Sequence, residues 1–430
     1  MRYQGKKAPV PSSAGSQNLI DIKGVLNILL FGSVLGIFAV EAALLLELQL
    51  SSKTPANADF MAFFAAARMV VSGLGDQLYS MDAQAFWQQQ VVGSSIGGVL
   101  PYYHPPFQII AYLPLTLMPL RWAYWVWNAI SLGIMAVSLI VFSSCLKPAS
   151  WRVNLLRWLA CLSFFPTVAI LILGQDSALL LLIFVAVFSD SKHGKEGRAG
   201  AILALGLFRP QLVVIPVLIL LFQRRWKAFG YFCVVAAALI SVSLLMVGWQ
   251  GGLDYIALVM KAATFEDQYG IFPSKMNNLK AFFYLILSPD QRPLLIPALI
   301  LATSGFLTLL FSVFRGPWQP SMRVFDLKFS VLILATLLVS PHLYIHDLVL
   351  LIIPGLLVLD HCTCEGSKVG GRPLRFGVPL GYVAILSSFL YSTVIHFQIG
   401  VAFMGISVIL LAYEIARVRR RDGGLDAVGA

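Results

Sequence analysis

The sequence predicts an all-α integral membrane protein, and three observations support this prediction. Of the 430 residues, 58% are hydrophobic and only 12% are charged, which is too little charge for a soluble protein of this length. Apolar runs of roughly 18 residues or more, long enough to cross a bilayer, recur along the chain. Positive charges gather in short loops between these runs. We expect a bundle of about 10 full transmembrane helices, with re-entrant or half-helices and two outer loops carrying short helices.

The distribution of basic residues predicts the topology, because Lys and Arg favour cytoplasmic loops. Basic clusters occur around residues 2–23, 147–157, 192–198, 224–227, 315–328, 368–375 and 417–421. The polar stretches 49–105 and 248–292 have no cationic excess and are assigned to the outside. The prediction is a cytoplasmic N-terminal tail over 1–23, a single membrane domain over 24–416 and a cytoplasmic C-terminal tail over 417–430. Topology accounts for the net charge of +11, so we expect no nucleic-acid partner.

The first half of the chain gives four predicted elements. The apolar run 24–48 is too long for a signal-peptide core and is expected to be an uncleaved span. Residues 59–75 have a helical pattern, apolar on most faces, that ends at glycines. Residues 105–120 contain too many prolines for an ordinary span, so we predict a half-helix followed by a full span over 121–146.

The rest of the chain contains several short elements. The run 199–222 breaks at Arg209–Pro210, and two full spans would need roughly forty residues, so we predict a re-entrant hairpin with Arg209 at its tip. Residues 277–288 are predicted to form a short outer helix. Three further segments are short for full crossings: 176–190, 327–341 and 345–360.

Polar residues from distant segments converge on the outer face of this topology, which predicts a site there. Asp59 is either a general base beside a cavity or a charge that favours the start of a helix. Arg209 either binds an anionic lipid phosphate or pairs with an acid such as Asp176 or Asp59. His346 and Asp347 form either a proton relay or interfacial hydrogen bonds.

Three other features leave alternatives open. Tyr103 and its neighbour in the turn before residue 106 form either an aromatic platform for a sugar or part of the interfacial belt. Gln175 either caps a helix with Gly174 or hydrogen-bonds a polar ligand. The tract His361-Cys-Thr-Cys364 is weak evidence for a metal, and we assign no role to His361, Cys362 or Cys364.

Six short motifs occur in order along the chain: Asp59-x-x-x-Phe, 73-GLGDQLY-79, 102-YYHPP-106, 174-GQDS-177, 208-FRPQ-211 and 340-SPHLYIHDLVLL-351. This ordered set resembles glycosyltransferase family 87, which belongs to the GT-C superfamily of polyprenol-dependent membrane sugar transferases. The resemblance covers roughly residues 25 to 360. It implies a GT-C-like bundle, a polyprenyl-phosphate sugar donor, typically the mannose form, and transfer to a hydroxyl on the periplasmic side.

The resemblance also implies roles for individual residues. The catalytic aspartate of the family matches Asp59, and the histidine after Ser-Pro matches His346. This chain has Arg209 where the family often has lysine, and Asp347 where it often has a second histidine. It has G-Q-D-S where the family has G-Q-x-N.

The predicted reaction moves a hexosyl unit, mannosyl by resemblance, to a lipid-linked or envelope glycan in an inner membrane. It is a metal-independent inverting displacement without a cofactor, with Asp59 as general base and His346 assisting. The residues predicted to bind the donor phosphate are Arg209, Lys275 and Lys280. Those predicted to bind sugar or acceptor are Tyr103, His104, Gln175, Asp176, Asn277, His342 and Asp347. The alternatives are a transporter or flippase of a lipid-linked or anionic substrate, although we find no internal repeat, and a glycan polymerase or ligase.

Overall fold

The computed structural model describes residues 58–93, 98–262, 271–364, 372–394 and 396–426, with a few isolated positions between 35 and 47. Over these residues the chain is helical and forms no strand, so the predicted all-α class is confirmed. The expected N-terminal tail and most of the expected first span lie outside the described residues.

The first part of the chain contains α3 (Phe60–Val71), η1 (Gly75–Gln77), α4 (Met81–Val92), η2 (Pro106–Ala111), η3 (Leu113–Leu117), α5 (Leu120–Ser143), α6 (Trp151–Leu162), α7 (Phe165–Leu173), α8 (Ser177–Lys192), α9 (Glu196–Leu205), η4 (Gly206–Phe208) and α10 (Pro210–Phe222). The second part contains α11 (Trp226–Ala262), η5 (Pro273–Lys275), α12 (Leu279–Ile286), η6 (Pro289–Leu294), α13 (Leu295–Val313), α14 (Arg323–Val339), η7 (Ile345–Leu351), α15 (Ile352–Cys364), α16 (Arg372–Val394) and α17 (Ile399–Asp426).

Several of these helices are long and apolar enough to cross a membrane. They are Leu120–Ser143, Trp226–Ala262, Pro289–Val313, Ile345–Thr363 and Ile399–Arg420. The pair α6 and α7, bent by 49°, would make a sixth span if the two helices cross together. Five or six candidate spans in the described part of the chain support a membrane protein, whereas the predicted count of about 10 is not confirmed.

The predicted irregular elements lie where the sequence placed them. The proline-rich run 105–120 folds as the two 3-10 helices η2 and η3 rather than as a half α-helix, and the span α5 follows. The run 199–222 breaks between α9 and α10, with Arg209 at the break. An ion pair between Arg225 and Glu196 joins the two ends of this hairpin. The short outer helix predicted over 277–288 is α12.

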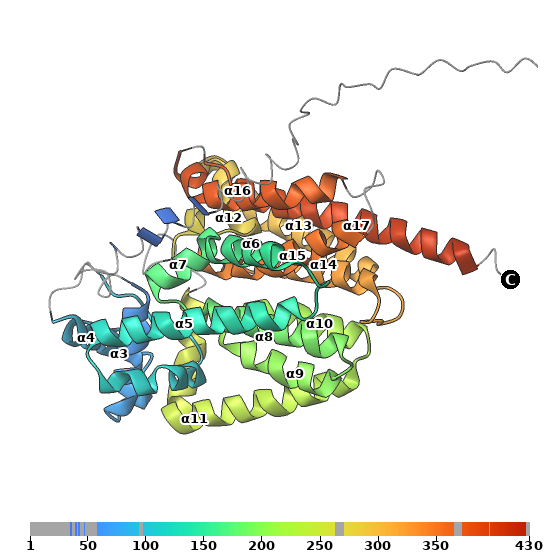
Figure 1. Ribbon diagram of the computed structural model, residues 1–430. Coiled ribbons are helices and arrows are strands. Elements are labelled where there is room, and N and C mark those ends of the chain that lie inside the picture. The colour runs from blue at the N-terminus through green and yellow to red at the C-terminus, as the bar shows by residue number, and fades with distance from the viewer. Residues whose placement is uncertain are drawn as a thin grey trace, which may run out of the picture.

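The basic clusters assigned to the cytoplasm meet at one end of the bundle. Lys192 Nζ lies 2.6 Å from Asp326 Oδ1, the backbone N–H of Lys147 donates to Asp360, and Arg419 donates to the carbonyl oxygen of Arg315. Figure 1 shows α3 and α4 at the opposite end from the C-terminal end of α17. Helix α17 runs to Asp426, so the boundary predicted at residue 416 falls inside a helix.

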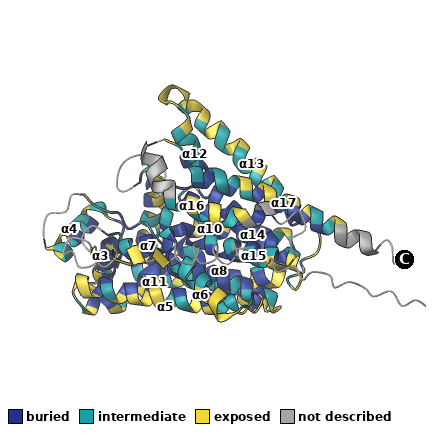
Figure 2. Cartoon of the chain, turned by 45° about the horizontal axis from the view of Figure 1, so that its top comes forward, coloured by how far each residue is buried: buried dark blue, intermediate teal, exposed yellow. Residues whose placement is uncertain are grey.

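The interior of the bundle is built on α8, α14 and η7, which are buried on most of their faces. Figure 2 shows α13 and the outer face of α11 with many exposed residues. Leu245 on α11 is 86% exposed and Leu301 on α13 is 77% exposed. Large apolar side chains exposed along entire helices are the pattern of a lipid-facing surface.

Two glycines permit close approach between helices. Gly75 packs against the backbone carbonyl of Met246, and Gly200 on α9 packs against the backbone carbonyl of Ala228 on α11. A Cβ atom at either position would overlap that carbonyl, so the chain requires glycine there. Small residues at helix contacts are typical of membrane bundles, because they allow backbones to approach closely.

We expect Gly200→Ala to destabilise the protein by about 1–3 kcal/mol, because α9 and α11 must separate to admit the methyl group. The matched control is Gly230→Ala on α11, where an added Cβ meets no atom within 4 Å. That variant should be neutral or more stable by up to about 1 kcal/mol. Thermal unfolding in detergent measures both. Equal melting temperatures for the two variants would show that the α9–α11 contact is not tight.

Candidate functional site

A polar cavity of about 140 Å³ lies where several segments meet. Its walls come from the start of α3, the turn before η2, the α7–α8 turn, the α9–α10 break and the segment after α14. The lining residues are Asp59, Ala62, Phe63, Leu100, Pro101, Tyr103, His104, Leu173, Gln175, Arg209, His342, Tyr344, Ile345 and His346. Segments far apart in the sequence therefore form one site, as predicted from the topology.

Asp59 stands at the N-terminal end of α3, but its side chain makes no capping hydrogen bond to that helix. Within the described part of the chain, the carboxylate accepts one hydrogen bond, from Gln175 Nε2 at 2.7 Å to Oδ2. The next residue, Phe60, is fully buried and packs edge-on against Tyr124 at 5.6 Å between ring centroids. Asp59 is thus both a helix-start residue and part of the cavity wall.

The turn between α7 and α8 carries Gln175 and Asp176 into the site. Gly174 ends α7 in the left-handed conformation, with φ of 62°, which glycine adopts without strain. A Cβ at this position would also lie 2.6 Å from Cβ of Phe60. Gly174 therefore ends the helix, as predicted, and brings the turn against the start of α3, which sets the contact between Gln175 and Asp59.

Arg209 pairs with two buried carboxylates. Its Nη2 donates to Asp176 Oδ1 at 2.9 Å, and its Nη1 lies 3.6 Å from Asp347 Oδ2. Nη2 also donates to Gln175 Oε1 at 2.6 Å. The sequence left phosphate binding and acid pairing open for Arg209, and the structure shows the acid pairs.

Both acids have further donors. Asp176 Oδ2 accepts a hydrogen bond from Gln108 Nε2, and Asp347 Oδ1 accepts one from the hydroxyl of Ser177 at 2.8 Å. Buried charges are stable only when they are paired and hydrogen-bonded in this way. Together with Asp59, the site holds three carboxylates and one guanidinium.

His346 lies in the wall of the cavity with unused hydrogen-bonding capacity. It is 3% exposed, and neither ring nitrogen has a hydrogen-bond partner among the described residues. Its Nε2 lies 3.7 Å from Asp347 Oδ2. A buried polar group without a partner calls for an explanation, and a ligand that enters the cavity is one.

The turn at residues 102–106 is held from several directions. The hydroxyl of Tyr79 donates to the carbonyl oxygen of His104 at 2.7 Å, and Gln84 hydrogen-bonds the backbone of Tyr102. The Tyr103 hydroxyl lies 3.2 Å from His342 Nε2. His104 Nδ1 lies 3.3 Å from the carbonyl oxygen of Phe208, so this nitrogen carries the proton and donates it. The motif 73-GLGDQLY-79 therefore supports the cavity wall.

The second outer stretch packs on the segment after α14. Asn278 Nδ2 donates to the carbonyl oxygen of Ser340 at 2.8 Å, and the backbone N–H of Asn277 donates to the carbonyl oxygen of Leu343 at 2.8 Å. The Tyr344 hydroxyl accepts a hydrogen bond from the N–H of Phe272 at 2.9 Å. These contacts hold the segment of chain that carries His342 and His346.

The predicted site residues divide into two groups. Seven line the cavity: Asp59, Tyr103, His104, Gln175, Arg209, His342 and His346. Five do not: Asp176, Asp347, Asn277, Lys275 and Lys280. Asp176 and Asp347 lie buried behind Arg209. Lys275 is exposed, with its ammonium 4.4 Å from the ring centroid of Phe272, and Lys280 is half-buried on α12.

Sequence analysis did not single out Tyr344, Gln108 or Ser177. Tyr344 lines the cavity, whereas Gln108 and Ser177 hydrogen-bond the two acids that pair with Arg209. Gln108 had a signal, because it is a lone amide in the apolar run 105–120. Ser177 stands in the GQDS motif where the family has asparagine, and the sequence assigned it no role.

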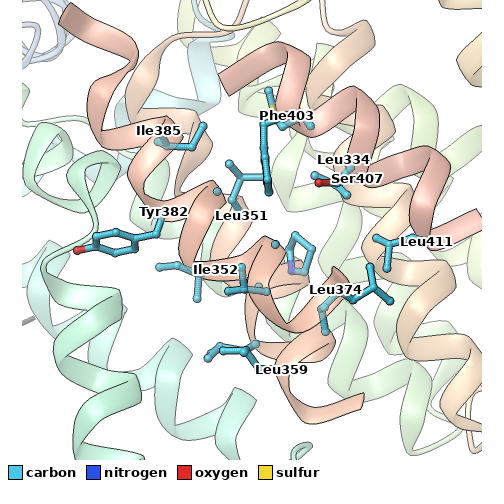
Figure 3. A pocket seen from close by; sticks show the side chains of 18 of the residues that line it. Leu334, Leu351, Ile352, Leu359, Leu374, Tyr382, Ile385, Phe403, Ser407 and Leu411 are labelled. Carbon is cyan, nitrogen blue, oxygen red and sulfur yellow. The ribbon is translucent and has the colours of Figure 1, made fainter. Parts of the chain in front are cut away.

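A second cavity, of about 190 Å³, is almost entirely apolar. Figure 3 shows its side chains, which include Leu351 and Ile352 on one side and Phe403 and Leu411 on the other. Leu351 is the last residue of η7, the 3-10 helix that also carries His346. The apolar cavity therefore shares a structural element with the polar one.

A polytopic α-helical membrane protein with a buried polar site is the class defined by this fold. Residues 102–341, more than half of the chain, match the model of glycosyltransferase family 87, and the chain belongs to this family. The matched region contains the GQDS and FRPQ motifs, whereas Asp59 and His346 lie outside it. No curated protein and no solved structure matches the chain significantly.

The stability of the protein should depend on the protonation of His104. Burial, followed by the positive charge of Arg209, lowers the pKa of His104 to about 3. An unfolded histidine has a pKa of about 6.5. Because the folded pKa is depressed, the stabilising contribution is complete above about pH 6.5 and is lost as the pH falls toward about 3.

As the pH falls from about 6.5 toward about 3, we expect the His104 contribution to lower the free energy of unfolding by up to about 1.4 kcal/mol per pH unit. His104→Asn retains a donor for Phe208 but does not titrate. Thermal unfolding in detergent at pH 7 and pH 5 should show a smaller loss of stability for this variant than for the wild type. Parallel losses would mean that His104 does not contribute to the pH dependence.

Proposed function

We propose that this glycosyltransferase moves a hexosyl unit, the mannosyl unit being the first candidate, from a polyprenyl-phosphate donor to a hydroxyl of a lipid-linked or envelope glycan. The observation that carries the proposal is the carboxylate of Asp59 in the wall of a polar cavity, opposite histidine and tyrosine side chains. Membership of family 87 supports the reaction class. The position of the basic clusters at the far end of the bundle supports a periplasmic site.

The chemistry requires one base. The acceptor O–H gives its proton to the Asp59 carboxylate while the acceptor oxygen forms a bond to the anomeric carbon of the donor. The bond from that carbon to the donor phosphate oxygen breaks, and its electron pair leaves with the polyprenyl phosphate. Attack opposite the leaving group inverts the anomeric centre. His346, with unpartnered ring nitrogens among the described residues, hydrogen-bonds the acceptor hydroxyl or the sugar.

The donor phosphate needs a cation that is not already neutralised. Arg209 is matched by two carboxylates, which leaves it poorly suited to this role. Lys280 does not line the cavity but is the better candidate, because its charge acts on His342 in the cavity wall. Burial, followed by Arg209 and, to a smaller extent, Lys280, lowers the pKa of His342 to about 4. The apolar cavity that shares η7 with the site would accommodate part of a lipid chain.

Asp59→Asn should reduce sugar transfer by about 10²–10⁴-fold, because the amide keeps the size of the side chain but cannot accept the proton. Transfer of radiolabelled sugar from polyprenyl-phosphate mannose or glucose into membrane lipids measures the effect. The control is Asp82→Asn on α4, which removes an exposed carboxylate outside the cavity and should retain activity. An active Asp59→Asn enzyme would refute the base, and a wild type inactive with every polyprenyl donor would favour a transporter.

The two outer lysines should differ in their effect on donor binding. We expect Lys280→Gln to raise KM for the donor by about 5–10-fold. This change corresponds to the loss of roughly 1 kcal/mol of attraction between one partly exposed ammonium and the donor phosphate. Lys275→Gln should leave KM within about twofold of the wild type, because that ammonium already stacks on the ring of Phe272 and does not line the cavity. Initial rates at varied donor concentration measure both. The opposite ranking would assign the phosphate to Lys275.

A further inference from the structure

The amide of Gln175 connects Arg209 to Asp59 and can do so in only one orientation. Its Oε1 lies 2.6 Å from Arg209 Nη2, and its Nε2 lies 2.7 Å from Asp59 Oδ2. A guanidinium only donates hydrogen bonds, and an ionised carboxylate only accepts them. A flipped amide would place two donors together at Arg209 and two acceptors together at Asp59. The contacts therefore determine which end of the amide faces Asp59.

Arg209 cannot move to follow a ligand without breaking buried ion pairs. It is 3% exposed, and Asp176 and Asp347 on either side of it are 1% and 0% exposed. Gln108 and Ser177 hydrogen-bond these two acids from behind. Removing one partner of a buried ion pair is strongly destabilising, so the guanidinium is a fixed donor toward Gln175.

With the Gln175 amide fixed, one of the two carboxylate oxygens of Asp59 accepts a hydrogen bond. Gln175 takes Oδ2, and in the described part of the chain no hydrogen bond reaches Oδ1. Asp59 has no capping bond to α3 that would hold its side chain from the helix side. The orientation of the base toward the cavity thus depends on the hydrogen bond from Gln175.

We propose that Gln175, held by Arg209, is a positioning residue that orients the Asp59 carboxylate, leaving Oδ1 to receive the proton of the acceptor hydroxyl. The inference rests on the proposed role of Asp59 as general base. It assigns to Arg209 and Gln175 a role in the attack step, in place of contacts with the donor phosphate and the sugar. Correct placement of a base within a few tenths of an ångström affects kcat more than substrate binding.

The test compares Gln175→Met and Gln175→Asn with the wild type. Methionine fills the space without hydrogen bonds, and the asparagine amide is one methylene shorter, so it cannot hydrogen-bond both Arg209 and Asp59 from the same backbone position. Loss of a hydrogen bond to a charged group corresponds to about a 10–100-fold change in rate. We expect both variants to lower kcat by about that factor and to leave KM for donor and acceptor within about threefold.

Three controls make the result interpretable. Gln223→Met removes a glutamine that donates to the carbonyl of Phe314 at the far end of the bundle, and should leave kcat unchanged. Thermal unfolding of every variant separates loss of folded protein from loss of rate. Asp59→Asn and wild type, assayed in parallel, test the proposed function itself.

Two results would overturn the inference while leaving the proposed function intact. With an active wild type and an inactive Asp59→Asn enzyme, a kcat within about twofold of wild type in a folded Gln175→Met or Gln175→Asn enzyme would exclude positioning. A raised KM with unchanged kcat would show instead that Gln175 binds the substrate directly. If Gln175→Met fails to fold, Gln175→Asn still decides, because it keeps a polar amide beside the buried Arg209.

Discussion

The burial of one guanidinium between two carboxylates is the constraint on which the site depends. Arg209 comes from the α9–α10 break, Asp176 from the α7–α8 turn and Asp347 from η7. A charge this far from water is stable only if its partners are held close, and each partner requires its own hydrogen bonds. The ion pairs therefore bring three separate segments of the chain together. Together with the packing of Gly174 against Phe60, they fix the turn that carries Gln175 relative to Asp59.

The backbone around these charges is irregular for a physical reason. A helix break leaves backbone N–H and carbonyl groups without hydrogen bonds, and the lipid chains of a bilayer cannot supply them. Such breaks are therefore stable only where protein or a water-filled cavity surrounds them. Helices α8 and α10, of 16 and 13 residues, both begin at the site. At about 1.5 Å per residue they extend roughly 24 and 20 Å, which is less than the hydrocarbon thickness of about 30 Å. Neither helix is therefore long enough to cross the membrane by itself.

The composition of the site is suited to proton acceptance more than to anion binding. It has three carboxylates for one guanidinium, and burial lowers the pKa of His104 and His342 to about 3 and about 4, so both are neutral at physiological pH. Of the two lysines predicted to bind the donor phosphate, Lys280 lies on α12 and Lys275 on η5, and neither lines the cavity. In the proposed reaction, with Asp59 as the base and Lys280 as the cation, the leaving group would lie toward α12 and the acceptor toward α3.

Hydropathy, charge asymmetry and proline positions determined the membrane class, the break at Arg209, the short helix α12 and the convergence of polar segments. These features follow from local composition, because burying a charge or breaking a helix in a membrane has a free-energy cost that depends on the individual residues involved. The number of full spans was not confirmed, and the proline-rich run 105–120 formed 3-10 helices. Short apolar segments do not reveal from sequence alone how deeply they cross.

The tertiary structure alone decided the partners of each polar side chain. The sequence left Arg209 open between a phosphate and an acid. Gln108 stands out in the sequence as a lone amide in an apolar run, but the sequence identified neither its partner Asp176 nor the bond from Ser177 to Asp347. It also grouped Asp176 and Asp347 with the sugar-binding residues, although both are buried behind Arg209. Hydrogen bonds and ion pairs depend on distances of a few ångströms between segments separated by as many as 239 residues, as for Tyr103 and His342. Such distances result from the packing of whole helices, which sequence spacing does not encode.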